Sequence, residues 1–152
     1  MILDTTYILP LAQISIDTDI LLAEAEDRTS LRLDKMSISS ISIFELQAKA
    51  AKLRIPATLV STALEAIQEN FEIVPFSDPK VIEQSFELRD RIPDYIDCLI
   101  VATAAVRNEE LASEDSRIWK ERKALWDNYG VKVSRYRDLV RTTPEVLRKT
   151  EK

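Results

Sequence analysis

The stretch Asp97-Cys98-Leu99-Ile100-Val101-Ala102-Thr103-Ala104 says more about the fold than any other part of the chain. It follows Pro93 and Asp94, which together are typical of a helix start, and its apolar and small side chains have helical spacing. A helix this apolar is expected to be largely buried, and its small residues allow another element to pack closely against it. Asp97 stands out at its head, because charged side chains are rarely buried without a partner.

Short apolar runs on both sides of this helix predict strands that alternate with helices. We predict strands at 1–3, 36–40, 71–76, 110–113 and 131–133, the last at a sheet edge. Helical patterns lie between them, at 6–14, 19–33, 41–53, from 56, from 79 to about 91, and after 115 through Trp119 and Trp126. Strands separated by helices imply right-handed crossovers and a parallel sheet. The predicted class is α/β.

The length of 152 residues suits a single domain with a real core. We find no repeat, low-complexity tract or Gly/Ser-rich linker, and we predict one domain over 1–152 with a basic tail at about 141–152. Residues 132–152 hold seven Lys or Arg against three Asp or Glu, whereas residues 1–131 hold 14 against 23. This basic end is either a surface for phosphates or a solvated terminus.

Composition excludes several kinds of chemistry. The chain has no histidine, which removes His-based nucleophile systems, zinc sites that use His, and acid–base catalysis by imidazole. Gly130 is the only glycine, so no glycine-rich phosphate loop can form. Cys98 is the only cysteine, and its apolar surroundings favour an inert core thiol. No targeting segment or membrane span is apparent, so we expect a cytoplasmic protein.

Four carboxylates lie where a parallel sheet would gather them, namely Asp4, Glu45, Asp97 and Asp115. Each opens or follows an apolar run, at the kind of strand end or helix start that builds a site in an open α/β sheet. Two carboxylates about 4 Å apart repel by about 4 kcal/mol at an effective dielectric of 20. A divalent cation would neutralise such a cluster, and oxygen ligands suit Mg²⁺ or Mn²⁺.

Each of these acids also has a purely structural explanation. Glu45 fits a capping box with Ser42, and Asp115 can cap its own helix. Asp94 can cap the helix that follows it, and Asp97 would then complement the helix dipole. Asp4 is harder to explain in this way, because it ends an apolar strand and precedes two threonines whose hydroxyls can hold a carboxylate or a water.

Four sequence blocks surround the acids, and they follow one another in order over most of the chain: Leu3-Asp4-Thr5-Thr6, Ser42-x-Phe44-Glu45-Leu46, Asp97-x-x-Ile100-Val101-Ala102-Thr103-Ala104 and Ser113-Glu114-Asp115. These blocks resemble those of the PIN-domain ribonucleases, above all the VapC-like toxins of toxin–antitoxin pairs. The third block is the most specific. The resemblance implies a PIN-like three-layer α/β/α fold with a central short, mainly parallel sheet.

The resemblance also implies a function and a site. It indicates a metal-dependent endoribonuclease in which Asp4, Glu45, Asp97 and Asp115 bind Mg²⁺ or Mn²⁺ and serve catalysis. The supporting residues would be Thr6, Ser113, Asp94 and Glu114. The expected partners are an RNA substrate, a small antitoxin protein and, by analogy with the family, a second copy of the chain.

The chain also has more apolar and aromatic residues than one small core needs, which favours a homodimer. These residues are Tyr7, Ile8, Leu11, Leu21, Leu22, Trp119 and Trp126.

Two departures from the family pattern are visible. Glu114 beside Asp115 makes the fourth acid ambiguous by one residue, and the stretch 117–130 is longer and more charged than in compact members of the family. Three other functions stay open: an RNA-processing nuclease without an antitoxin, a non-catalytic PIN-like binding module, and a phosphoacceptor signalling domain. The last would need an acidic pair after the first strand and a lysine after the last, whereas this chain has Asp4 alone and Lys132 inside the predicted strand.

Overall fold

The protein is built around very short parallel strands. A computed structural model describes residues 1–141. The strands are β1 (Ile2–Leu3), β2 (Ser37–Ser39), β3 (Glu72–Val74), β4 (Leu111–Ala112) and β5 (Val133–Ser134). They form one sheet in the order β3-β2-β1-β4-β5, and every pairing in it is parallel. The predicted α/β class, parallel sheet and edge position of the last strand are confirmed.

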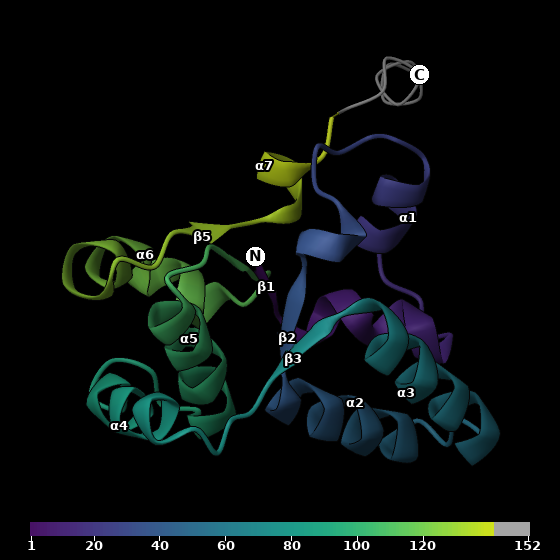
Figure 1. The fold of residues 1–152 in the computed structure, drawn as a ribbon, viewed down its shortest axis with the longest axis horizontal. Helices are drawn as coiled ribbons and strands as arrows, with labels where there is room; N and C mark the ends of the chain where they lie inside the picture. Colours follow the sequence, from purple (N-terminus) through teal and green to yellow (C-terminus); the bar gives the residue numbers. More distant parts are fainter. Residues whose placement is uncertain (142–152) are drawn as a thin grey trace.

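Helices cover both faces of this sheet and complete a three-layer α/β/α sandwich. They are η1 (Thr5–Ala12, a 3₁₀ helix), α1 (Ile20–Ala25), η2 (Leu33–Lys35, also 3₁₀), α2 (Ser40–Lys52), α3 (Ala57–Asn70), α4 (Pro79–Leu88), α5 (Tyr95–Arg107), α6 (Ser116–Tyr129) and α7 (Tyr136–Leu139). Figure 1 shows α4, α5 and α6 on one side of the strands and α1, α2 and α3 on the other.

Each face of the sheet has its own hydrophobic core. On the α5 side, Ile2 and Leu111 from the strands pack with residues of α4, α5 and α6. On the other side, Leu3 and Ile38 pack with residues of η1, α1, α2 and α3. Successive strand residues therefore point to opposite cores, as the period of two requires.

The run from Cys98 to Ala104 is buried along its whole length, as its composition predicted. Thr103 satisfies its hydroxyl by donating to the Leu99 carbonyl oxygen at 2.8 Å. The Cys98 thiol is buried, and burial raises its pKa to about 11, which keeps the thiol protonated and inert. The apolar helix therefore fixes the position of Asp97 in its first turn.

The helix predicted over 19–33 is too long. The observed α1 ends at Ala25, Asp27 adopts a left-handed backbone (φ 55°), and Thr29 forms an antiparallel bridge with Val140. The Thr29 hydroxyl also donates to the Leu139 carbonyl oxygen at 2.6 Å. A tertiary contact with a segment more than a hundred residues away thus overrides the local helical pattern, as often happens where propensity is weak.

Most of the residues that suggested a homodimer are used inside the subunit. Tyr7 and Ile8 are fully buried, and Leu11, Leu21 and Trp119 pack at the edges of the two cores. Leu22 and Trp126 remain, with 50% and 59% of their surface exposed. The argument for a dimer from surplus apolar residues is therefore weaker than the sequence indicated.

The predicted basic tail lies outside the described residues except for Arg141, whose amide donates to the Arg28 carbonyl oxygen at 2.7 Å. Among residues 1–141, none of the helices combines the length and apolar character that crossing a membrane requires.

Candidate active site

The predicted acids meet at one hollow of about 270 Å³ near the carboxyl ends of the central strands. Its lining residues are Asp4, Thr6, Glu45, Lys49, Asp94, Asp97, Glu114, Asp115 and Arg117. All four predicted catalytic acids are present, together with three of the four predicted supporting residues. Six carboxylates from separate parts of the chain therefore share one small space with two cations.

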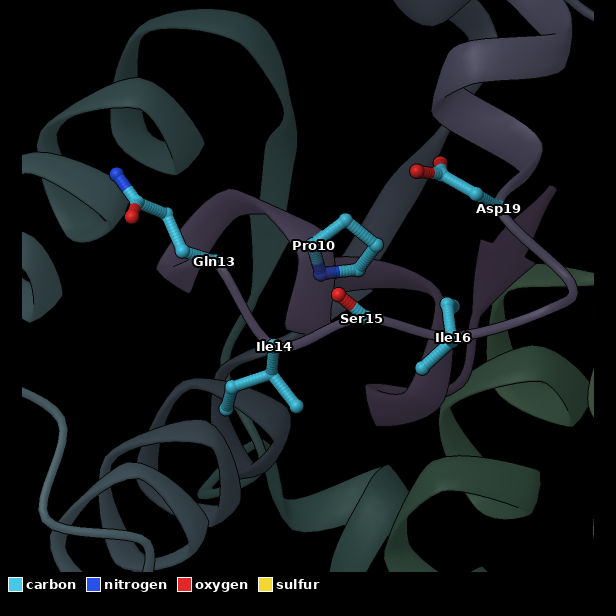
Figure 2. Close-up of a pocket in the computed structure, with 6 residues that line it drawn as sticks. All are labelled: Pro10, Gln13, Ile14, Ser15, Ile16 and Asp19. Carbon is cyan, nitrogen blue, oxygen red and sulfur yellow. The ribbon is translucent and has the colours of Figure 1, made fainter.

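A second, larger hollow of about 460 Å³ lies elsewhere and is lined by fewer ionisable residues. Figure 2 shows its lining, which comes from the end of η1 and the segment that leads into α1. Among its lining residues from the described range 1–141, Asp19 is the only ionisable one, and its carboxylate already caps α1 by accepting from the Leu22 amide at 2.9 Å. We therefore place the candidate site at the acidic hollow.

Strand register positions the first acid. Leu3 of β1 pairs with Ala112 of β4, so the residues that follow, Asp4 and Ser113, leave the sheet side by side. The Ser113 hydroxyl donates to Asp4 Oδ2 at 2.6 Å, and the Thr5 amide donates to Asp4 Oδ1 at 2.7 Å. Ser113 does not line the hollow itself but holds the carboxylate that does.

Asp4 is the most deeply buried of the acids, with 6% of its surface exposed. Burial raises its pKa to about 6 even though the bonds from Ser113 and Thr5 favour the charged form, and nearby Glu45 and Asp115 raise the pKa further. A carboxylate kept inside the protein against this cost is a strong candidate for a functional group.

The capping explanation for Glu45 is wrong. Helix α2 begins at Ser40, with Ser39 as its N-cap, so Ser42 and Glu45 lie inside the helix and not at its start. Glu45 Oε2 instead accepts from the Thr5 hydroxyl at 2.6 Å, and Glu45 Oε1 lies 3.3 Å from the Lys49 ammonium nitrogen. Glu45 thus faces the strand end that carries Asp4.

Asp97 and Asp115 share one arginine, Arg117, as a cationic partner. A terminal nitrogen of Arg117 lies 3.4 Å from Asp97 Oδ2 and 3.5 Å from Asp115 Oδ2. Burial raises the pKa of Asp97 to about 7, and Asp4, Asp115 and Asp94 add to the rise while Arg117 opposes it. The arginine therefore compensates only part of the negative charge.

Asp115 performs two roles at once. Its Oδ1 accepts from the Arg117 and Ile118 amides at 2.7 and 3.1 Å, so the predicted helix cap is confirmed. Its Oδ2 faces Arg117 and the hollow. Capping and a site role use different oxygens of the same carboxylate and do not exclude each other.

Glu114 is held differently from its neighbour. Its Oε1 accepts from the Tyr7 hydroxyl and from the Tyr136 amide, both at 2.6 Å. These bonds tie the end of β4 to η1 and to the start of α7. Of the two adjacent acids, Asp115 is thus the one with a carboxylate oxygen directed at Asp97 through Arg117, and Glu114 has a structural anchor.

Asp94 is a helix cap, as predicted, because its Oδ1 accepts from the Ile96 amide at 2.9 Å and from the Asp97 amide at 3.4 Å. Sequence reasoning named Thr5 as able to hold a carboxylate but did not identify it as the partner of Glu45, and it missed the cations Lys49 and Arg117. Lys49 carried a signal, since it lies four residues after Glu45 on a helix. The role of Arg117 depends on the meeting of α5 and α6, which no local pattern reveals.

The residues fit a hard divalent cation by their chemistry, since the hollow offers carboxylate oxygens and hydroxyls. Within residues 1–141, however, no three acidic or cysteine side chains are arranged to coordinate an ion together. Arg117 and Lys49 contact carboxylates of the same hollow. A cation would compete with these two side chains for the same oxygens.

The chain belongs to the PIN domain family, whose model matches residues 1–124. The matched region contains all four predicted acids, and the family resemblance expected from the sequence is confirmed. A comparison with curated proteins found no match.

Solved structures of the same fold include several complexes of toxin–antitoxin systems. FitAcB from Neisseria gonorrhoeae is 21% identical with a TM-score of 0.63, and the match covers 91% of this chain and 99% of that one. VapBC2 from Rickettsia felis, bound to a DNA fragment from its promoter, is 22% identical with a TM-score of 0.61 over 88% and 96% of the two chains. A toxin–antitoxin complex from Klebsiella pneumoniae is 21% identical with a TM-score of 0.59 over 86% and 93%.

The raised pKa of Asp97 predicts that Asp97→Asn stabilises the protein in EDTA at pH 8 more than at pH 5. Between about pH 4 and pH 7 the folded state binds more protons at this site than the unfolded state, so wild-type stability falls as pH rises through that window. The side-chain amide introduced by Asp97→Asn carries no charge at any of these pH values, so the stability of the variant does not fall in this way. Because solvent screens the open hollow, we expect a gain of about 1 kcal/mol, or roughly 2–4 °C in Tm.

Thermal melts at both pH values measure this effect, with Asp90→Asn on the exposed surface as the matched control. A Tm difference between Asp97→Asn and wild type that is the same at pH 5 and pH 8 would contradict the prediction.

The different anchoring of Glu114 and Asp115 predicts unequal effects of their substitution on stability. Glu114→Ala leaves the Tyr7 hydroxyl without its acceptor and is expected to lower the free energy of unfolding by about 1–3 kcal/mol. Asp115→Asn keeps an equally good N-cap, so we expect a change below about 0.5 kcal/mol. Urea denaturation of both variants checks this, and equal losses would show that the two acids are not distinguished in this way.

Proposed function

We propose that the protein is a metal-dependent endoribonuclease that hydrolyses RNA phosphodiester bonds and serves as the toxin of a type II toxin–antitoxin pair. Members of the PIN family are nucleases, which supports hydrolysis of nucleic acid by this chain. The observation that carries the proposal is the convergence of Asp4, Glu45, Asp97 and Asp115 on one hollow. The acids come from four separate elements, and packing alone gives no reason to bring them together.

In this proposal the four carboxylates hold Mg²⁺ or Mn²⁺. PIN nucleases generally use divalent metal ions, and oxygen-rich donors match these cations. The bound cation would lower the pKa of the attacking water and neutralise charge on the scissile phosphate. No histidine is needed for this chemistry, in agreement with a chain that has none.

The residues of the chain have separable roles in the reaction. Asp4 gives a carboxylate fixed by Ser113 and the Thr5 amide, and the Thr5 hydroxyl fixes Glu45 in the same way. Such fixed acids cost little reorganisation when charge develops on the phosphate. Asp97 and Asp115 would become available to a cation once Arg117 leaves them, and the freed guanidinium could then pair with a substrate phosphate.

The supporting residues act through these four acids. Ser113 orients Asp4, Asp94 caps the helix that begins just before Asp97, and Glu114 fixes the end of β4. Thr6 lines the hollow, where its hydroxyl can hold a water molecule.

The hydrolysis itself balances simply. The water oxygen bonds to phosphorus as the bond from phosphorus to the 3′ oxygen breaks, one proton of the water goes to solvent or a carboxylate, and the leaving oxygen takes up a proton. The products carry 5′-phosphate and 3′-hydroxyl ends. The ribose 2′-hydroxyl is not the nucleophile in this reaction.

The toxin role and an antitoxin partner are supported by the structural neighbours, which are complexes of toxin–antitoxin systems. We propose a small antitoxin protein as partner and a homodimer as the assembly. A short gene with a DNA-binding pattern immediately upstream would distinguish the toxin from an RNA-processing nuclease that has no antitoxin.

The phosphoacceptor alternative loses its remaining support. Lys132 precedes β5 at the amino end of the strand, and its ammonium pairs with Glu110 at 3.1 Å, on the edge of the sheet opposite the acidic hollow. A lysine in that position cannot reach a phosphate near Asp4.

We expect purified protein to cleave structured RNA with Mn²⁺ or Mg²⁺ and to be inactive in EDTA. Asp97→Asn is expected to lower the cleavage rate by about 100-fold or more, as for the loss of one strong electrostatic contact to a transition state. Asp90→Asn, an exposed acid outside the hollow, is the control and retains activity. Gel analysis of the rate with end-group mapping of the products measures both predictions.

Cleavage that survives both EDTA and Asp97→Asn would exclude the proposed site. If calorimetry finds no Mn²⁺ binding at millimolar metal, the chain is instead a non-catalytic PIN-like binding module.

A further inference from the structure

A cluster of arginines surrounds one tryptophan next to the acidic hollow. The guanidinium carbons of Arg122 and Arg135 each lie 4.5 Å from the centroid of the Trp119 ring, and that of Arg137 lies 5.8 Å away. Arg122 comes from α6, whereas Arg135 and Arg137 follow β5. We call Trp119, Arg122 and Arg135 the Trp119 cluster.

The two arginines of the Trp119 cluster have no acidic partner in the part of the chain that the structure describes. Neither has a carboxylate oxygen within 4.0 Å among the described residues, although the chain holds 26 Asp and Glu. Arg122 donates to the Trp119 carbonyl oxygen at 3.0 Å, and Arg135 Nε is buried without a hydrogen-bond partner in the described part of the chain.

Two positive charges are thus held on one ring, with no carboxylate paired to either of them among the described residues. Both guanidinium carbons lie at the same distance from one centroid, so they are separated by no more than twice that distance. Two cations held this close repel, and an anionic ligand would relieve the repulsion. The Trp119 ring also fixes the guanidinium groups by cation–π contact, which reduces the entropy that a ligand would have to overcome.

The cluster lies at the same edge of the sheet as the acidic hollow. The Trp119 amide donates to the Asp115 carbonyl oxygen at 3.0 Å, so the tryptophan is one helical turn beyond the fourth acid, with Arg117 between them. Arg135 directly follows Ser134, whose carbonyl oxygen accepts from the Ser113 amide at 3.0 Å. Figure 1 shows α6 beside β5 and the chain continuing from β5 into α7.

We propose that the Trp119 cluster binds the phosphodiester backbone of single-stranded RNA beside the bond that is cleaved. The proposal rests on the proposed function, because it extends that site to the flanking nucleotides. An acidic hollow repels the phosphates of its own substrate, so cations next to it are needed to hold the strand. Guanidinium forks match phosphate oxygens, and contacts to phosphates position a strand without reading its sequence.

Binding can be tested without cleavage by fluorescence anisotropy in EDTA, with a labelled 12-nucleotide oligouridylate and a mixed-sequence RNA of equal length as probes. The test variant is Arg122→Gln/Arg135→Gln. The matched control, Lys35→Gln/Lys132→Gln, removes the same charge from residues that precede β2 and β5 at the opposite edge of the sheet. Arg122→Gln alone, at an exposed position, keeps the test valid if the double variant fails to fold.

We expect the double arginine variant to raise Kd about tenfold or more for both RNAs. Each lost phosphate contact should lower the slope of log K against log salt by about 0.7, and two contacts by about 1.4. The control variant should change Kd by less than about threefold. An equal loss in the two double variants, or none in the arginine variant, would overturn the proposal.

Two further outcomes separate this proposal from the proposed function. Wild-type protein that cleaves RNA with Mn²⁺ but shows no arginine-dependent binding overturns the role of the cluster and leaves the nuclease intact. Arginine-dependent binding without cleavage in any metal supports the cluster and removes the nuclease. Arginine-dependent binding of oligoglutamate but not of RNA would assign the cluster to an acidic protein partner and overturn the proposal.

Discussion

Asp4 carries a carboxylate into the protein interior at the end of the central strand, and much of the surrounding structure serves to keep it there. The parallel register of β1 and β4 brings Ser113 alongside, and the Ser113 hydroxyl and the Thr5 amide each bind one carboxylate oxygen. The Thr5 hydroxyl donates to Glu45, so α2 is connected to the same hydrogen-bond network. Burial still raises the pKa of Asp4, so these bonds offset only part of the cost of desolvation.

The distribution of cations around the hollow follows from the same excess of negative charge. Arg117 spans Asp97 and Asp115, and Lys49 pairs with Glu45, so the acids are partly balanced by side chains of the chain itself. One helical turn further along α6 the local charge becomes positive, because Arg122 and Arg135 share the Trp119 ring and have no acidic partner among residues 1–141. An acidic centre and a basic margin lie side by side in a chain whose net charge, −5, suggests neither.

Patterns close together in sequence were enough to predict most of the fold. The alternation of apolar runs and helical patterns gave the parallel sheet, and the composition of Cys98–Ala104 gave the buried helix. Long-range contacts account for the errors: Val140 holds Thr29 outside the helix predicted over 19–33. At the site, the sequence named the four acids, but the partners of Glu45 and Glu114 come from η1 and α7, and no local spacing indicates them.

The pairing of β1 with β4 also constrains how the protein can be made. Asp4 and Ser113 meet across a separation of 109 residues, and Asp115 lies beyond that point. Contacts this distant in sequence form only after the intervening chain has been closed into a loop, which makes them slow relative to local structure. During synthesis, the acidic hollow cannot assemble until β4 and the start of α6 have left the ribosome. A nascent chain of this protein therefore remains without its complete carboxylate cluster while most of its length is being translated.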